Sequence, residues 1–127
     1  MGRPESAVEH YFRNRFLLNG FMCFKFTAPG ISGVPDRLVI GHGHTVFVEL
    51  KAPGEEPRDL QYKTIEDMAK HGAEIYIVDS RSDVDVLIEH LKSHPRRAVK
   101  PAPGMAVQMW INKWRERRKE RKNREEN

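Results

Sequence analysis

Residues 33–51 read GVPDRLVIGHGHTVFVELK, and this stretch decides the fold. Apolar residues dominate two runs, 36–40 and 45–51, which predict two β-strands. The Gly-His-Gly-His segment at 41–44 predicts a tight connection between them and therefore a β-hairpin. The H-x-H spacing of His42 and His44 is typical of an exposed loop here, because no cysteine or third metal ligand accompanies it.

The predicted hairpin brings two carboxylates together. A two-residue turn and a four-residue loop give the same register, in which Asp36 lies directly across from Glu49. Carboxylates that face each other across a sheet repel, and a divalent cation between them would remove that repulsion. A loop of three or five residues would place the two side chains on opposite faces, so the prediction depends on the register.

Lys51 completes a candidate catalytic set. Side chains two residues apart in a strand share a face, so Glu49 and Lys51 point the same way while Val48 and Leu50 point into the core. A lysine beside a metal-held phosphate either stabilises negative charge in the transition state or positions and deprotonates the attacking water. With Asp36, the set predicts metal-assisted hydrolysis of a phosphodiester bond.

Signals on both sides of the hairpin predict a mixed α/β layer fold. The first helix has Pro4 in its first turn and stops at Asn19-Gly20, and Ser82 is the expected cap of the third helix. The predicted order is helix, three strands, helix, strand, helix. The further predicted elements are strands at 21–26 and 74–78 and a helix at 57–71.

The run from GVPD at 33–36 to ELK at 49–51 resembles the PD-(D/E)xK nuclease signature. Its details are similar to those of the VRR-NUC family. The resemblance covers about residues 4–91. It rests on a glutamate early in the first helix, a strand lysine, the G-x-P-D turn, the E-x-K motif and a glutamine in the next helix: Glu5, Lys25, Gly33, Pro35, Asp36, Glu49, Lys51 and Gln61.

The resemblance implies a restriction-endonuclease-like core, in which a central mixed β-sheet is flanked by helices. It implies that Asp36 and Glu49 bind Mg²⁺ or Mn²⁺ and that Lys51 is the catalytic lysine. By the same resemblance, Gln61 supports the site and Glu5 is an outer metal or water ligand. Glu9, one helical turn later, is the alternative to Glu5.

The net charge of +4 is divided unevenly along the chain. Residues 96–127 hold 11 Lys/Arg and 4 Asp/Glu, whereas residues 1–95 hold 11 and 14. We therefore expect a nuclease domain at 1–95, a Pro-rich linker at 96–104 and a basic helical tail at 105–127, disordered at its end. Either DNA contact or dimerisation explains the tail. The candidate phosphate-binding residues are Lys25, Arg115, Arg118, Lys119, Arg121 and Lys122.

Together these features predict a metal-dependent DNA endonuclease. Its resemblance to small Holliday-junction resolvases and to stand-alone relatives implies a homodimer that acts on branched DNA such as four-way junctions. Two alternatives stay open: a non-catalytic DNA-binding or assembly protein with a nuclease-like core, and a metal-dependent nucleotide phosphohydrolase. The single cysteine excludes a disulfide scaffold, and no stretch has the roughly 18–20 apolar residues of a membrane span. The absence of a secretory signal predicts a cytoplasmic protein without membrane contact.

Overall fold

The structure is a computed structural model, and it describes residues 6–55, 57–97 and 107–126. The chain divides into two compact units, Met1–Arg97 and Ala98–Asn127. The predicted linker at 96–104 lies mostly outside the described residues. No helix among the residues described is long and apolar enough to cross a membrane.

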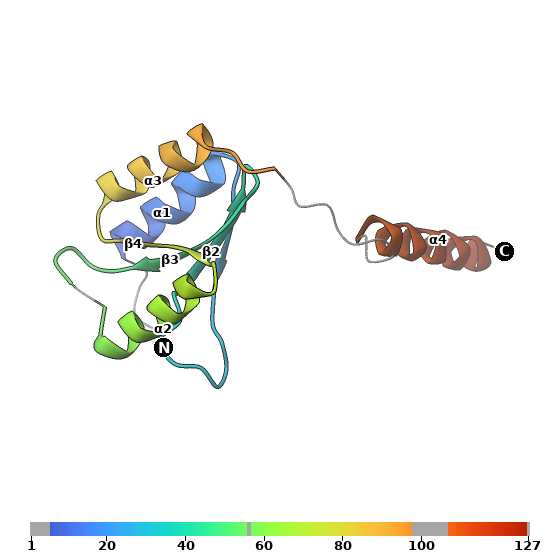
Figure 1. Cartoon of the computed structure of the whole chain (residues 1–127). Helices are drawn as coiled ribbons and strands as arrows, with labels where there is room; N and C mark the ends of the chain where they lie inside the picture. The colour runs from blue at the N-terminus through green and yellow to red at the C-terminus, as the bar shows by residue number, and fades with distance from the viewer. Residues whose placement is uncertain (1–5, 56, 98–106, 127) are drawn as a thin grey trace. The chain divides into compact units, whose positions relative to one another are not determined.

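The first unit is a four-stranded mixed sheet with helices on both faces (Figure 1). The sheet order is β1-β2-β3-β4; the first two pairings are antiparallel, and β3 and β4 are parallel. This confirms the predicted central mixed sheet. The elements are α1 (Ala7–Leu18), β1 (Met22–Lys25), β2 (Arg37–Gly41), β3 (His44–Leu50), α2 (Asp59–Lys70), β4 (Glu74–Val78) and α3 (Arg81–Ser93).

The hydrophobic core lies between the sheet and the helix pair α1 and α3. These two helices pack against each other on one face of the sheet, while α2 lies on the other (Figure 1). Phe12 and Phe16 of α1 are fully buried, with ring centroids 4.5 Å apart. They meet the sheet through its inward-facing valines, and α3 contributes Val84, Leu87, Ile88 and Leu91. This layer holds the β2–β3 hairpin rigidly from one side.

The register of the hairpin is the predicted one. Arg37 pairs with Val48 and Gly41 pairs with His44, so the next position outward places Asp36 across from Glu49. The turn works because His42 and Gly43 both adopt positive φ, 52° and 80°, which is the backbone shape of a two-residue hairpin turn. The sequence therefore brings the two carboxylates to one end of the hairpin.

Three predictions need correction. Ser80, not Ser82, caps α3, because its extended backbone lets its side chain accept a hydrogen bond from the Asp83 amide at 3.1 Å. His44 is buried, at 3% exposure, because the chain after α3 covers it: its ring contacts the His94 carbonyl at 2.6 Å and Glu74 at 3.1 Å. The helix of the tail continues to Glu126, where disorder was expected.

The second unit contains one long helix, α4 (Val107–Glu126). Its described side chains are almost all exposed, and basic residues lie on every side of it. Two cations stack on its tryptophans: Lys113 lies over Trp110 at 5.4 Å and Arg118 over Trp114 at 4.8 Å. The five basic residues predicted to contact DNA are all exposed on this helix.

Candidate active site

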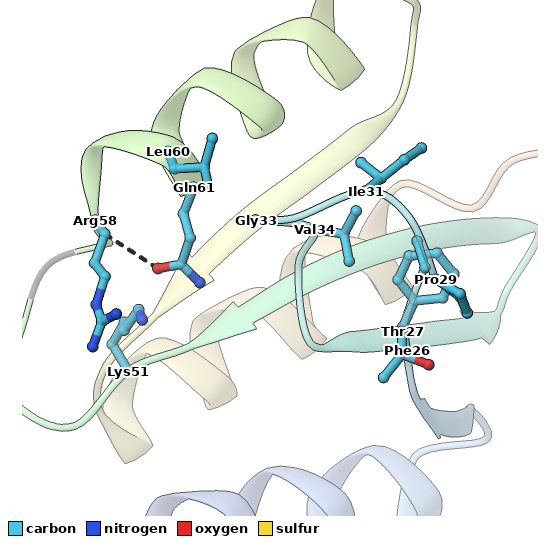
Figure 2. Close-up of a pocket in the computed structure, with 11 residues that line it drawn as sticks. Phe26, Thr27, Pro29, Ile31, Gly33, Val34, Lys51, Arg58, Leu60 and Gln61 are labelled. Carbon is cyan, nitrogen blue, oxygen red and sulfur yellow. Dashed lines mark hydrogen bonds between the residues drawn. The ribbon is translucent and has the colours of Figure 1, made fainter.

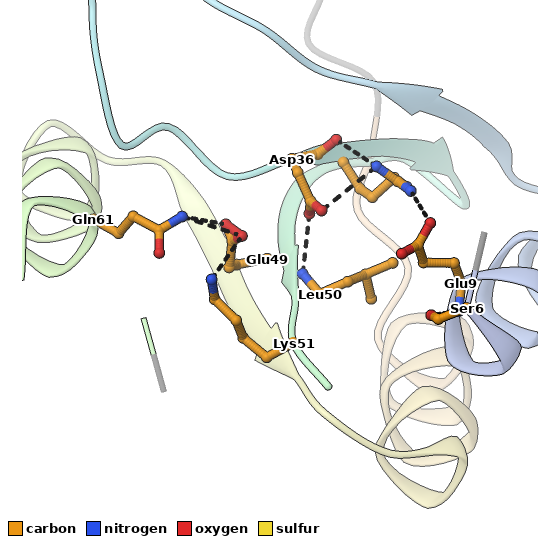
Figure 3. Close-up of polar contacts among 8 residues, drawn as sticks. Ser6, Glu9, Asp36, Glu49, Leu50, Lys51 and Gln61 are labelled. Carbon is orange, nitrogen blue, oxygen red and sulfur yellow. Dashed lines mark hydrogen bonds and ion pairs between the residues drawn. The ribbon is translucent and has the colours of Figure 1, made fainter. Parts of the chain in front are cut away.

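The candidate site is built at the end of the hairpin where β2 begins and β3 ends (Figure 3). Asp36 precedes β2, Glu49 lies near the end of β3, and Lys51 directly follows that strand. Gln61 reaches the same place from the first turn of α2. The structure thus brings together four of the residues that the sequence predicted, from three segments of the chain.

Glu49 is the central group of the site. It is only 3% exposed, yet its described polar contacts are long: both carboxylate oxygens lie 3.4 Å from the Gln61 amide nitrogen, and one lies 3.8 Å from the Lys51 ammonium. Burial, followed by repulsion from Asp36, raises the pKa of Glu49 from its ordinary 4.5 to about 7. A buried carboxylate so weakly compensated is a site that a cation would stabilise.

Asp36 is fixed in direction by the neighbouring strand. Its Oδ1 accepts a hydrogen bond from the Leu50 amide at 3.0 Å, and its Oδ2 lies 3.5 Å from Arg37 Nη1. Burial raises the pKa of Asp36, while the Leu50 amide and the Arg37 charge oppose that rise. The Leu50 hydrogen bond ties the aspartate of one strand to the strand that carries Glu49.

Lys51 and Gln61 are held in place by the backbone around them. The Lys51 amide donates to the Val78 carbonyl at 2.9 Å, which extends the β3–β4 pairing by one residue. The Gln61 side-chain oxygen accepts from the Arg58 amide at 3.1 Å, so its amide nitrogen points toward Glu49 (Figure 3). Both donors therefore converge on the same carboxylate.

The donor set fits a hard divalent cation. Asp36 and Glu49 offer carboxylate oxygens, which Mg²⁺ prefers, and Mg²⁺ commonly uses one or two carboxylates with water and phosphate oxygens. No cluster of three His, Cys, Asp or Glu side chains suited to a metal occurs within residues 6–55, 57–97 and 107–126. In such a site Asp36 and Glu49 would be the protein ligands among the described residues, and water and substrate oxygens would fill the remaining positions.

Sequence reasoning missed the role of Arg37. This arginine is buried, and it joins Glu9 of α1, 3.3 Å from its Nη2, to the Asp36 carbonyl and carboxylate. The sequence feature that could have predicted its burial is the alternation of side chains along β2, which places Arg37 on the same buried face as Val39. Glu9 therefore contacts the site through Arg37, whereas Glu5 lies outside the described residues.

Lys25 lies apart from the carboxylates, on the edge strand β1. It is exposed and pairs across the sheet with Arg37. Its place on an exposed edge suits either phosphate contact or protection of that edge. The structure gives it no contact with Asp36, Glu49 or Lys51 among the interactions described.

The fold and the site define a restriction-endonuclease-like α/β domain, and comparisons with known proteins identify its family. No family model matches the sequence. A protein of Acyrthosiphon pisum secondary endosymbiont phage 1, named "Putative nuclease p44", is 34% identical over 84 residues, which are 65% of this chain and 90% of that protein.

Solved structures agree with the phage relative. One described as "VRR_NUC domain" is 39% identical, with a TM-score of 0.63 over 68% of this chain and 95% of that chain. A second, "VRR_NUC domain protein", is 19% identical with a TM-score of 0.57, over 80% of this chain and 98% of that chain, and it supports the fold alone. The chain belongs to the VRR-NUC family of nucleases.

Proposed function

We propose that this nuclease is a Mg²⁺- or Mn²⁺-dependent DNA endonuclease that hydrolyses phosphodiester bonds. The observation that carries the proposal is the buried Glu49 carboxylate, held beside Asp36 with only long contacts to Lys51 and Gln61. Burial of Glu49 beside the partly exposed Asp36 is costly without a cation, and a nuclease active site is the place where that cost is useful.

Asp36 and Glu49 are the proposed metal ligands. A divalent cation bound there would polarise the phosphate and lower the pKa of bound water. Lys51 places its ammonium at the same site, where it stabilises the negative charge of the transition state or positions the attacking water. Gln61 orients Glu49, and Arg37 orients Asp36, so both act on the ligands rather than on the substrate.

The expected substrate is branched DNA, such as a four-way junction, cut by a homodimer. Residues 1–95 hold 11 Lys/Arg against 14 Asp/Glu, so this part of the chain is a poor electrostatic partner for DNA. The basic α4 helix supplies the phosphate contacts in this proposal. A two-fold dimer would match the approximate symmetry of a four-way junction with two active sites.

A cleavage assay tests the proposal. Four-way junctions, flaps, linear duplex and single strands are incubated with the full chain in Mg²⁺, Mn²⁺ or EDTA, beside Lys51→Ala and the exposed control Lys70→Ala. We expect cleavage with either metal, fastest on a branched substrate, which is lost in EDTA and in Lys51→Ala but kept in Lys70→Ala. Binding without cleavage would favour a non-catalytic DNA-binding protein.

A second comparison separates the nuclease from a nucleotide phosphohydrolase. The variant replaces the five basic residues of the helical tail with glutamine: Arg115, Arg118, Lys119, Arg121 and Lys122. A DNA endonuclease loses affinity for DNA in this variant, because phosphate contacts are removed. A nucleotide hydrolase keeps its full rate on nucleoside triphosphates, and that result would contradict the proposal.

A further inference from the structure

A pocket of about 600 Å³ opens beside Lys51 and Gln61. It lies between the loop from Phe26 to Val34 and the first turn of α2 (Figure 2). Pockets that bind small ligands have volumes of roughly 300–1,000 Å³, so it can hold a group the size of a nucleotide. Lys51 and Gln61 are shared with the active site, but the rest of the pocket has no part in the roles described above.

The pocket is apolar at one end and positively charged at the other. Phe26, Pro29 and Ile31 form an apolar wall from the loop, and Lys51 and Arg58 lie at the opposite end with Gln61 (Figure 2). Of the described residues that line it, none is acidic. Arg58 makes no ion pair with a carboxylate among the described residues. This combination suits a ligand that joins a flat ring to an anionic group.

The walls of the pocket are preformed. Gly33 adopts a φ of +84°, and a Cβ there would lie 2.9 Å from the Leu60 carbonyl oxygen, so the loop approaches α2 as closely as its backbone allows. Thr64 of α2 donates a hydrogen bond to the Ser32 carbonyl at 2.8 Å. The Phe26 ring rests edge-on against Phe47, with centroids 5.2 Å apart. A preformed pocket binds its ligand without a large ordering cost.

We infer that this pocket binds one unpaired nucleotide of the DNA substrate, adjacent to the phosphodiester bond that is cut. The inference rests on the proposed function, because Lys51 belongs both to the pocket and to the active site. The base stacks on the apolar wall, and Arg58 contacts the phosphate next to the scissile one. A base inside a duplex cannot enter such a pocket unless it leaves the stack. Selectivity for branched DNA then follows where bases at the branch are unpaired, as in a flap, or leave the stack more easily, as at a four-way junction.

The test scans single abasic sites along the unpaired strand of a branched substrate that the full-length protein cuts. We expect one position next to the cut to reduce cleavage by roughly tenfold, the effect of losing one base-stacking contact, while its neighbours have little effect. Equal rates for all abasic substrates would overturn the inference and leave the nuclease function intact.

Variants link that position to the pocket. Ile31→Ser, at a residue that is 61% exposed, should slow cleavage of the intact substrate and abolish the abasic penalty. Arg58→Gln should weaken cleavage of both substrates equally. The matched controls are Leu18→Ser, another exposed apolar residue, and Lys63→Gln, an exposed lysine of the helix that begins directly after Arg58. A penalty that persists in Ile31→Ser would place the base elsewhere and contradict the inference.

A binding measurement separates failure of the inference from failure of the proposed function. Fluorescence polarisation of the same abasic series, in EDTA, reports the pocket without cleavage. If no substrate is cut but one abasic position weakens binding and Ile31→Ser removes that effect, the nuclease proposal fails and the nucleotide pocket stands. If cleavage occurs but no abasic position affects binding or rate, the nuclease proposal stands and the nucleotide pocket fails.

Discussion

Replacing Glu49 with glutamine should stabilise the metal-free protein while it removes the activity. The native carboxylate is 3% exposed, and its pKa is raised from 4.5 to about 7 by burial and by Asp36. A raised pKa means that the folded state binds this proton more tightly than the unfolded state does. The free energy of unfolding therefore falls as pH increases from about 4.5 to about 7.

The size of the effect follows from the shift. At about 1.4 kcal/mol per pKa unit, ionised Glu49 costs the folded state about 3 kcal/mol above pH 7 and nothing below pH 4.5. Glutamine has the same shape and no charge, so Glu49→Gln should gain about that amount at roughly pH 8 and close to none near pH 4.5.

Urea unfolding of the metal-free protein at several pH values measures this difference directly. Glu66→Gln is the matched control, because Glu66 is exposed and pairs with Lys70 at 2.8 Å; its replacement should not stabilise the protein at any pH. Addition of Mg²⁺ should stabilise the native protein and not Glu49→Gln. If Glu49→Gln is the less stable protein at roughly pH 8, the carboxylate is compensated by Lys51 and Gln61, and the argument for a cation site is refuted.

Three further predictions follow from the same geometry. Arg37→Leu should lower the free energy of unfolding by about 2 kcal/mol in urea unfolding, because Glu9 and Asp36 lose their shared buried cation; an unchanged midpoint would contradict its positioning role. Gly33→Ala should cost more stability than Gly30→Ala in thermal unfolding, since both have positive φ but only Gly33 touches α2; equal losses would show that the close approach is unimportant. Replacing the five basic residues of α4 should flatten the dependence of DNA affinity on salt, measured by fluorescence polarisation from low to physiological salt; an unchanged slope would remove the tail from the DNA contact.

The hairpin register was predictable because few turn lengths fit a Gly-His-Gly-His connection. Short turns fix which residues face each other, so the pairing of Asp36 with Glu49 followed from counting residues. The directions of Glu49 and Lys51 followed from strand alternation. The burial of Glu49 could not be predicted from the sequence, because it depends on α2, which lies on the opposite face of the sheet from α1 and α3.

Contacts between segments distant in the sequence were beyond sequence reasoning. The burial of His44 depends on the chain after α3, which returns to the hairpin, where the Arg96 amide donates to the His42 carbonyl at 3.0 Å. Arg37 gains its role from Glu9 of α1, 28 residues away. Neither contact leaves a local pattern, since each depends on how the helices dock on the sheet.

The choice between Glu5 and Glu9 shows the same difficulty. Glu5 lies three residues before Val8 and seven before Phe12, so helical spacing places it at the end of the apolar face of the first helix. That prediction stays open because Glu5 is outside the described residues. Glu9 contacts Arg37, which in turn contacts Asp36. The Glu9 carboxylate therefore has Arg37 as a partner. The spacing of Glu5 and Glu9, one helical turn apart, could not predict this contact.

Cleavage of a branched DNA by Asp36→Asn, compared with the native protein in Mg²⁺ and in EDTA, tests the central claim most directly. Losing even an outer ligand costs about 10–100-fold in metal affinity or activity, so loss of a direct ligand should cost at least about a hundredfold. The account predicts that Asp36→Asn in Mg²⁺ is as inactive as the native protein in EDTA. Cleavage by either at the native rate would contradict it.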